Sequence, residues 1–125
     1  MTSSAHQVNF CDGRWDGRIV REWLPEVISD VVDAARPLRV IVFGSLARGD
    51  EGPESDADLL LVVDRLDRTN RPEFMAAIRR AIRAPIPVDV LVTDPDEIAE
   101  RGDVNGSSLY WPLREGQVVY DPAAA

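Results

Sequence analysis

The chain has 125 residues, the size of one ordinary domain, and its 45% hydrophobic and 29% charged content is typical of a folded globular protein. The 22 acidic and 14 basic residues give a formal net charge of -8, which disfavours non-specific binding to DNA or to an anionic membrane. All the basic residues are arginine, which excludes a Walker-type phosphate loop and Schiff-base chemistry through lysine. A single cysteine and a single histidine exclude an intrachain disulfide and a Cys/His zinc cluster.

The first twenty residues do not predict a targeting segment. They are polar and lack the apolar core of a signal peptide, and no apolar run approaches membrane-spanning length, so we expect a cytoplasmic protein with no membrane partner. Residues 1–17 have no clear hydrophobic period and contain the turn signals Asp12-Gly13 and Asp16-Gly17. They predict a loosely structured lead-in, followed by a single domain over residues 18–125.

Two stretches of periodic apolar residues predict helices. Between Ile19 and Ala35 apolar residues recur at three- and four-residue steps, which predicts an amphipathic helix with a kink or a restart at Pro25. A second helix is predicted over Arg71 to Arg83, with Asn70 as its cap. Shorter helical segments are predicted in three further places: Ser45 to Arg48, a helix opened by Asp94-Pro95-Asp96-Glu97, and Ser107 to Arg114.

Short apolar runs rich in β-branched residues predict the strands. They are Leu38 to Phe43, Asp58 to Val63, Val88 to Val92 and Gln117 to Tyr120. The second run is apolar on both faces after its first residue, which predicts a strand in the interior of the sheet. The last run is predicted as a closing edge strand. Strands that alternate with helices predict an α/β or α+β fold, with helices packed on one main sheet.

The first candidate for chemistry is Gly44-Ser45, where a strand turns into a helix. Glycine permits close backbone approach, serine offers a hydroxyl, and the free N–H groups of a helix start favour a phosphate. Alone, a Gly-Ser pair after a strand is more often ordinary turn chemistry.

The second and third candidates are carboxylates at strands. Asp56 and Asp58 precede an apolar run, and residues two apart in a strand point to the same face. Asp89 is the one acid among apolar strand residues. If the two strands are neighbours, the three carboxylates converge near the Gly-Ser turn, as a two-Mg²⁺ phosphoryl-transfer site requires. The alternative for Asp56 and Asp58 is a solvated strand end.

The segment from Val40 to Asp64, VIVFGSLARGDEGPESDADLLLVVD, resembles the signature of the minimal nucleotidyltransferases of the DNA polymerase β superfamily. That signature is Gly-Ser, ten residues, then Asp-x-Asp, and Ser45 and Asp56 bracket residues 46–55 here. Val88-Asp89-Val90 is similar to the third carboxylate of the family, and residues 114–120 are similar to its C-terminal end. Leu46 stands where the family often has arginine.

The resemblance implies a polymerase β-like fold with a small mixed sheet, and a role for each motif residue. Gly44 and Ser45 would hold the β- and γ-phosphates of a nucleoside triphosphate, ATP or another. Asp56 and Asp58 would ligate two Mg²⁺ ions. Asp89 would bind the catalytic metal and help to deprotonate the acceptor. These three are therefore the expected catalytic and metal-binding residues.

Other residues allow alternative interpretations. Arg48 could contact a phosphate, or form a salt bridge that orients an aspartate; pairing is the default for an arginine near carboxylates. Trp15, Trp23 and Trp111 could stack on a base, although tryptophans near amphipathic helices more often pack in a core or an interface. His6 and Cys11 have no orienting third group and do not form a nucleophilic pair.

Three functions compete. The first is an enzyme that transfers NMP from an NTP, ATP first among them, to a hydroxyl of a protein or other acceptor. By resemblance, it could be the antitoxin of a HEPN-type RNase toxin, or form a homodimer. The second is a stoichiometric binding partner with the same fold, against which the three aspartates argue. The third is an antibiotic nucleotidyltransferase, which would need a partner to complete its acceptor pocket.

Overall fold

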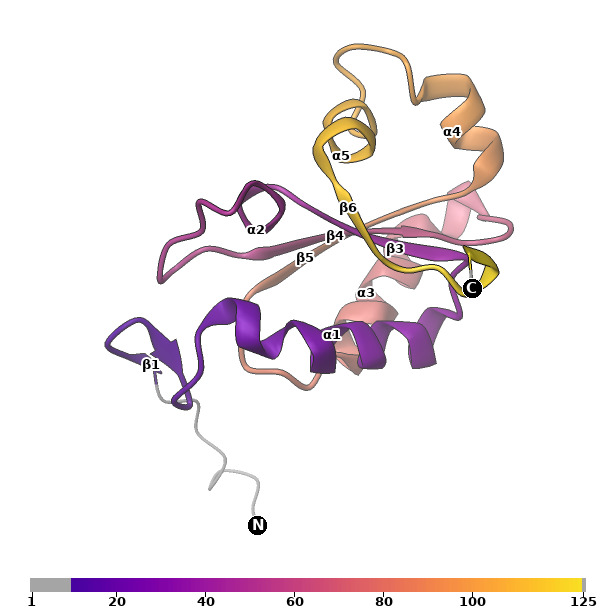
Figure 1. Ribbon diagram of the computed structural model, residues 1–125. Coiled ribbons are helices and arrows are strands. Elements are labelled where there is room, and N and C mark those ends of the chain that lie inside the picture. Colours follow the sequence, from indigo (N-terminus) through magenta and orange to yellow (C-terminus); the bar gives the residue numbers. More distant parts are fainter. Residues whose placement is uncertain (1–9, 125) are drawn as a thin grey trace.

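The computed structural model describes residues 10–124, which form a four-stranded mixed sheet with helices on both faces (Figure 1). The strand order is β5-β4-β3-β6. β3 (Arg39–Phe43) runs antiparallel to β4 (Ala57–Val62) and to β6 (Gln117–Tyr120), whereas β5 (Val88–Thr93) runs parallel to β4. The predicted α+β fold is confirmed, with β4 in the interior of the sheet and β6 at its edge.

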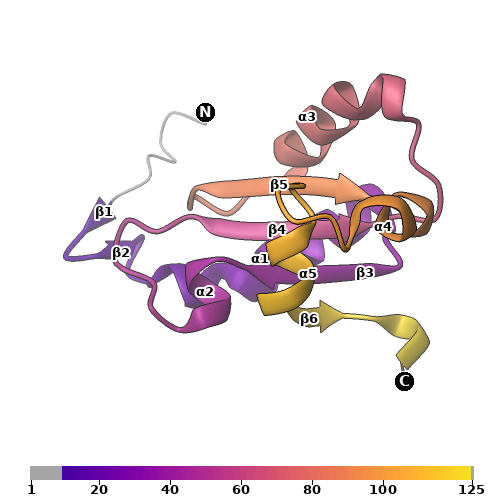
Figure 2. The ribbon, with the colours of Figure 1, turned by 90° about the horizontal axis from the view of Figure 1, so that it is seen from above.

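The helices form two layers around this sheet (Figure 2). α1 (Val20–Ala35) and α3 (Arg71–Ala81) cover one face, and α4 (Pro95–Arg101) and α5 (Tyr110–Glu115) lie over the other. The short α2 (Ser45–Arg48) follows β3 directly. Residues 10–124 also contain two 3-10 turns, η2 (Arg68–Asn70) and η3 (Pro122–Ala124).

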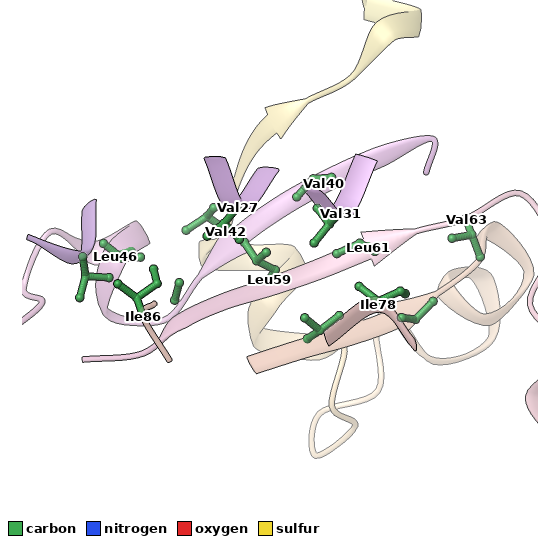
Figure 3. Packing of buried hydrophobic residues seen from close by; sticks show 14 of the residues in the cluster. Val27, Val31, Val40, Val42, Leu46, Leu59, Leu61, Val63, Ile78 and Ile86 are labelled. Atoms are coloured by element: carbon green, nitrogen blue, oxygen red, sulfur yellow. The ribbon is translucent and has the colours of Figure 1, made fainter. Parts of the chain in front are cut away.

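The alternation of side chains along β4 divides the core in two. Leu59 and Leu61 point toward α1 and α3, where they pack with Val27, Val31 and other buried residues (Figure 3). Leu60 and Val62 point to the other face and join a smaller cluster with Ile41 and Leu109. Residues 59–62 are fully buried, which is why this strand is apolar on both sides. The end of the strand that carries Asp58 is thus firmly anchored.

α1 forms as its hydrophobic period predicts. Val27 and Val31 lie one turn apart on its buried face and have no exposed surface. The helix continues through Pro25, so the alternative of a restart at this residue is wrong. Its first turn is tied by the Ile19 N–H, which donates to the Glu22 carboxylate at 2.9 Å.

The described part of the predicted lead-in forms a short hairpin. Residues 1–9 and His6 among them lie outside the described residues, but β1 (Phe10–Cys11) and β2 (Arg14–Trp15) pair as an antiparallel hairpin. Asp12 and Gly13 both have positive φ, as a two-residue hairpin turn requires. Trp15 packs against the main core, which attaches the hairpin to the domain.

Two helix boundaries differ from the prediction. α3 ends at Ala81 instead of Arg83, because the Arg83 N–H and guanidinium both donate to the buried carboxylate of Asp30, each at 2.9 Å. Asn70 does not cap α3 through its side chain, which instead donates to Asp67 at 3.1 Å. α5 begins at Tyr110, so that Pro112 lies in the first turn, where no backbone N–H is needed.

Candidate active site

Two of the predicted carboxylates lie on neighbouring strands in register. Asp58 in β4 is the partner of Asp89 in the parallel β5. Strand alternation places both on the face of Leu60 and Leu91, which is the face covered by α4 and α5. The conditional expectation that the two strands are neighbours is therefore met, and two negative charges stand side by side at one end of the sheet.

Asp56 lies just before β4 and is exposed. Its charge nevertheless acts on Asp58, whose pKa it raises after the larger effects of burial and of Asp89. The residue between the two aspartates, Ala57, is fully buried, and its N–H donates to the Pro87 carbonyl at 3.0 Å. This bond fixes the starts of β4 and β5 against each other, while the side chain of Asp56 projects into solvent.

Asp58 is a half-buried carboxylate whose pKa is raised. Burial raises this pKa above the ordinary value; the charges of Asp89 and Asp56 raise it further, and Arg48 lowers it. Within residues 10–124 its carboxylate accepts no hydrogen bond and forms no ion pair. A partly desolvated carboxylate without a partner is costly in free energy, and its cost is relieved by a bound cation or by protonation.

Gly44 forms a wall directly against this carboxylate. Phe43, at the end of β3, is the register partner of Asp58, so the next residue passes directly beside the acid. Gly44 has φ +70° and ψ −148°, a region of backbone conformation that is essentially restricted to glycine. A Cβ atom at this position would collide with Asp58 Oδ2. Both the turn and the close approach therefore require glycine.

The chain then turns into α2, whose first residue is Ser45. Arg48 N–H donates to the Gly44 carbonyl at 3.1 Å and closes the first turn. The N–H groups at the start of a helix lack partners within it and point outward, toward any ligand that carries negative charge. Leu46, in place of the arginine often found in the family, is 2% exposed and packs in the core.

These residues line one open cleft of about 700 Å³. Gly44, Ser45, Arg48 and Asp58 form one side. The other side comes from α5 and the segment before it: Ser107, Ser108, Trp111, Pro112 and Glu115. Its volume is in the range of cofactor and nucleotide sites. The cleft thus joins the Gly-Ser turn to the carboxylate that the sequence predicts.

Arg48 forms ion pairs, but not with a predicted site aspartate. Its guanidinium contacts Asp50 at 3.2 Å and Glu115 at 3.1 Å. Of the two interpretations of Arg48, the salt bridge with an aspartate is present, and that aspartate is Asp50. The arginine also joins α2 to α5 across the cleft, and its charge lowers the pKa of Asp58 from a distance. A phosphate contact by Arg48 remains a prediction.

The donor chemistry of the site suits a hard cation. Asp56, Asp58 and Asp89 offer carboxylate oxygens, the ligands that Mg²⁺ prefers, and Asp58 has no competing partner among the described residues. In residues 10–124 no three His, Cys, Asp or Glu side chains stand close enough together to hold a metal ion as they are placed. The register pair of Asp58 and Asp89 is the part of the predicted set that the fold preassembles.

The remaining candidates separate clearly. Cys11 lies in the hairpin, where it is exposed and has a free thiol. Trp15 and Trp23 pack against the core, as expected. Trp111 does not pack in the core: it lines the cleft, and 59% of its surface is exposed.

In the part of the chain that the structure describes, no helix has the length and apolar character needed to cross a membrane.

Arg21 is a residue of the site region that sequence reasoning missed. From α1 it donates to the Leu46 carbonyl of α2 at 2.7 Å, and its Nε lies 2.8 Å from Glu51 Oε2 in the loop that leads to Asp56. The sequence around Arg21 does not predict these contacts, because both partners lie more than twenty residues away in the chain. Only the fold brings them together.

Comparison with known proteins agrees with this geometry. The profile of the nucleotidyltransferase domain family matches residues 24–109, and the chain belongs to this family. The fold is similar to the crystal structure of a protein from Sulfolobus solfataricus, whose description gives nucleotidyltransferase as a provisional assignment. The TM-score is 0.58 at 25% sequence identity, over 82% of this chain and 80% of that chain. No significant match was found among curated proteins.

Proposed function

We propose that the chain transfers a nucleoside monophosphate from an NTP, ATP first among them, to a hydroxyl group of an acceptor, with release of pyrophosphate. The observation that carries this proposal is the register pair of Asp58 and Asp89, with Asp58 lining the same cleft as Gly44 and Ser45. Membership of the nucleotidyltransferase domain family supports nucleotidyl transfer in general. Mg²⁺ dependence, the choice of ATP and the acceptor are part of the proposal.

The phosphate end of the nucleotide would bind at the start of α2. Gly44 leaves the backbone open there, and the hydroxyl and N–H of Ser45 can donate to phosphate oxygens. The guanidinium of Arg48 lies on the same wall of the cleft and would add a positive charge when a phosphate displaces its partners. These contacts would orient the triphosphate with its reactive phosphorus toward Asp58.

The carboxylates would hold the divalent cations. Asp56, Asp58 and Asp89 are the residues that would ligate Mg²⁺, which when bound neutralises charge on the triphosphate and at the attacked phosphorus. Asp89 is exposed at the open side of the pair, so that its carboxylate oxygen can accept the proton of an acceptor hydroxyl. Asp58 lies deeper, between Asp89 and the Gly44 wall.

We further propose a macromolecular acceptor, with the HEPN-type RNase of a toxin–antitoxin pair as the leading candidate. The cleft is open, and residues 10–124 form one α/β layer structure without a separate helical domain that would close over a small acceptor. An acceptor brought by a protein partner fits such a site. A purely stoichiometric antitoxin has no use for a glycine-only turn at Gly44 and an unpartnered Asp58, and we therefore favour the enzyme.

The test is transfer of label from two positions of ATP. The protein is incubated with Mg²⁺, lysate of its host and ATP labelled on either the α- or the γ-phosphate. We expect one dominant labelled species from the α-label and none from the γ-label, since the γ-phosphate leaves in pyrophosphate. Identification of that species by mass spectrometry then distinguishes a toxin from other acceptors. Transfer of the γ-label alone would contradict nucleotidyl transfer.

A further inference from the structure

The cleft contains an aromatic side chain that the proposed chemistry does not use. Trp111 lies on α5 and is 59% exposed, whereas the other two tryptophans pack against the core. It lines the same cleft as Ser45 and Asp58. α5 lies over the sheet beside α2 (Figure 2), and Trp111 belongs to the side of the cleft that α5 forms, across from α2.

The indole is supported by neighbouring side chains. The Tyr110 ring meets Trp111 edge-on, with ring centroids 5.1 Å apart and an interplanar angle of 85°. The guanidinium of Arg114 lies over the Tyr110 ring at 3.7 Å and donates to the Gly102 carbonyl at 2.8 Å. Asp103 binds the same guanidinium at 2.9 Å. This arrangement limits the freedom of the tryptophan although it is exposed.

The charges in the cleft assign its two ends to different parts of a ligand. The start of α2 and Arg48 suit phosphates, and Asp58 and Glu115 would repel anything anionic placed without a cation. The segment before α5 contributes Ser107 and Ser108, which are uncharged; the Ser107 hydroxyl donates to the Arg101 carbonyl at 2.8 Å and keeps its oxygen as an acceptor. Glu115, one turn after Trp111 on α5, is paired with Arg48. This end therefore suits a flat, neutral, hydrogen-bonding group.

We propose that Trp111 is the platform on which the base of the nucleoside triphosphate stacks, with the hydroxyls of Ser107 and Ser108 at the edge of the base. The inference rests on the proposed function and extends it by assigning the base subsite. A ligand held at the α2 end by its phosphates and at the α5 end by its base spans the cleft. Stacking accepts any base, so discrimination between bases falls to the two serines.

The experiment compares a ligand that has a base with one that has none. Binding of ATP and of inorganic tripolyphosphate, each with Mg²⁺, is measured by calorimetry for the wild type, Trp111→Ala, Trp111→Phe and Asp58→Asn. We expect Trp111→Ala to weaken ATP binding roughly 5- to 100-fold, the range of base–aromatic stacking, and to leave tripolyphosphate binding unchanged. Trp111→Phe should retain most of the ATP affinity, and Asp58→Asn should weaken both ligands.

The outcomes separate this inference from the function on which it rests. If Trp111→Ala binds ATP as tightly as the wild type, or loses ATP and tripolyphosphate in equal proportion, the base subsite is overturned while the phosphate site stands. The first of these results would fit a tryptophan that contacts a protein partner instead. If the wild type binds neither ligand, the proposed function fails and this inference with it. Because Trp111 is exposed, both variants should melt within a few degrees of the wild type.

Discussion

The carboxylate of Asp58 occupies the space that a side chain at position 44 would need. A Cβ atom on Gly44 would collide with Asp58 Oδ2 and would lie 3.2 Å from its Cγ. The half-buried acid can therefore occupy this position only because the residue at the turn into α2 is a glycine. The Gly-Ser and Asp-x-Asp parts of the sequence signature depend on each other sterically, in addition to any ligand that they share.

Gly44→Ala should therefore be more destabilising than an ordinary glycine substitution. The new residue would be held in a glycine-only conformation and against a carboxylate, and we expect a loss of roughly 3 kcal/mol in the free energy of unfolding. The matched control is Gly49→Ala, at φ +79° with no atom near its Cβ position. It should cost about 1 kcal/mol. Urea unfolding measures both, and equal losses would show that the contact with Asp58 has no energetic consequence.

Asp58→Asn should raise stability at neutral pH when no divalent cation is present. The unfolded chain releases this proton near the ordinary pKa of 3.8, and the folded protein releases it at higher pH. The folded state thus binds more protons between the two pKa values. Stability falls as the pH rises through that window, and the full penalty is present at a pH above both pKa values.

We expect Asp58→Asn to raise the free energy of unfolding by about 1 kcal/mol or less. Solvent reaches this half-buried carboxylate and reduces both its desolvation and the repulsion from its neighbours. Melting in EDTA at pH 7 and at about pH 4 measures this gain, and the difference between variant and wild type should shrink at the lower pH. Asp64→Asn, an exposed acid beyond the other end of β4, is the control and should change little. A less stable Asp58→Asn protein at pH 7 would mean that the carboxylates do not repel each other.

Asp89→Asn should separate binding from turnover. Asp89 is exposed on the open side of the pair, whereas Asp58 lies beside the Gly44 wall. We expect Asp89→Asn to retain more affinity for Mg²⁺ with a non-hydrolysable ATP analogue than Asp58→Asn retains, and to lose turnover in comparable measure. Titration calorimetry beside single-turnover rates decides this. Equal losses of affinity in the two variants would show that Asp58 and Asp89 do not differ in their contributions to binding and turnover.

Arg21→Ala should weaken nucleotide binding without contacting the nucleotide. Its guanidinium holds the Leu46 carbonyl of α2 and the Glu51 carboxylate of the following loop. We expect a stability loss of about 1 kcal/mol, because the ion pair is partly exposed, together with a higher Kd for ATP with Mg²⁺. Glu51→Gln keeps the contact to Leu46 and should have the smaller effect on Kd. An Arg21→Ala protein with unchanged Kd would show that α2 holds its position unaided.

The sequence predicted the elements whose pattern is local and repetitive. The buried strand after Asp58 and the helix after Ile19 follow from apolar spacing alone, and both formed within one residue of their predicted starts. The end of α3 was missed because it depends on Asp30, more than fifty residues away. The N-terminal hairpin was missed because its strands have two residues each, too few for a period; the Asp12-Gly13 turn was the available signal.

Part of the candidate site could also be predicted from local sequence patterns. The signature located Gly44, Ser45, Asp56 and Asp58, and the register of β4 with β5 brought Asp89 beside Asp58. The partners of Arg48 and the exposure of Trp111 depend on where α5 packs over the sheet, which no local pattern encodes. Long-range contacts of this kind are fixed by the assembled fold and not by spacing.

The central claim is that the cleft of Asp58 carries out nucleotidyl transfer, and label transfer from α-labelled ATP by purified variants tests it most directly. With Mg²⁺ and the acceptor identified in lysate, Asp58→Asn should transfer at least about a hundredfold more slowly than the wild type, because a metal ligand is lost. Asp64→Asn should match the wild type, since it removes the same charge from a position just beyond the opposite end of β4. Label transfer by Asp58→Asn at the rate of Asp64→Asn would contradict the account.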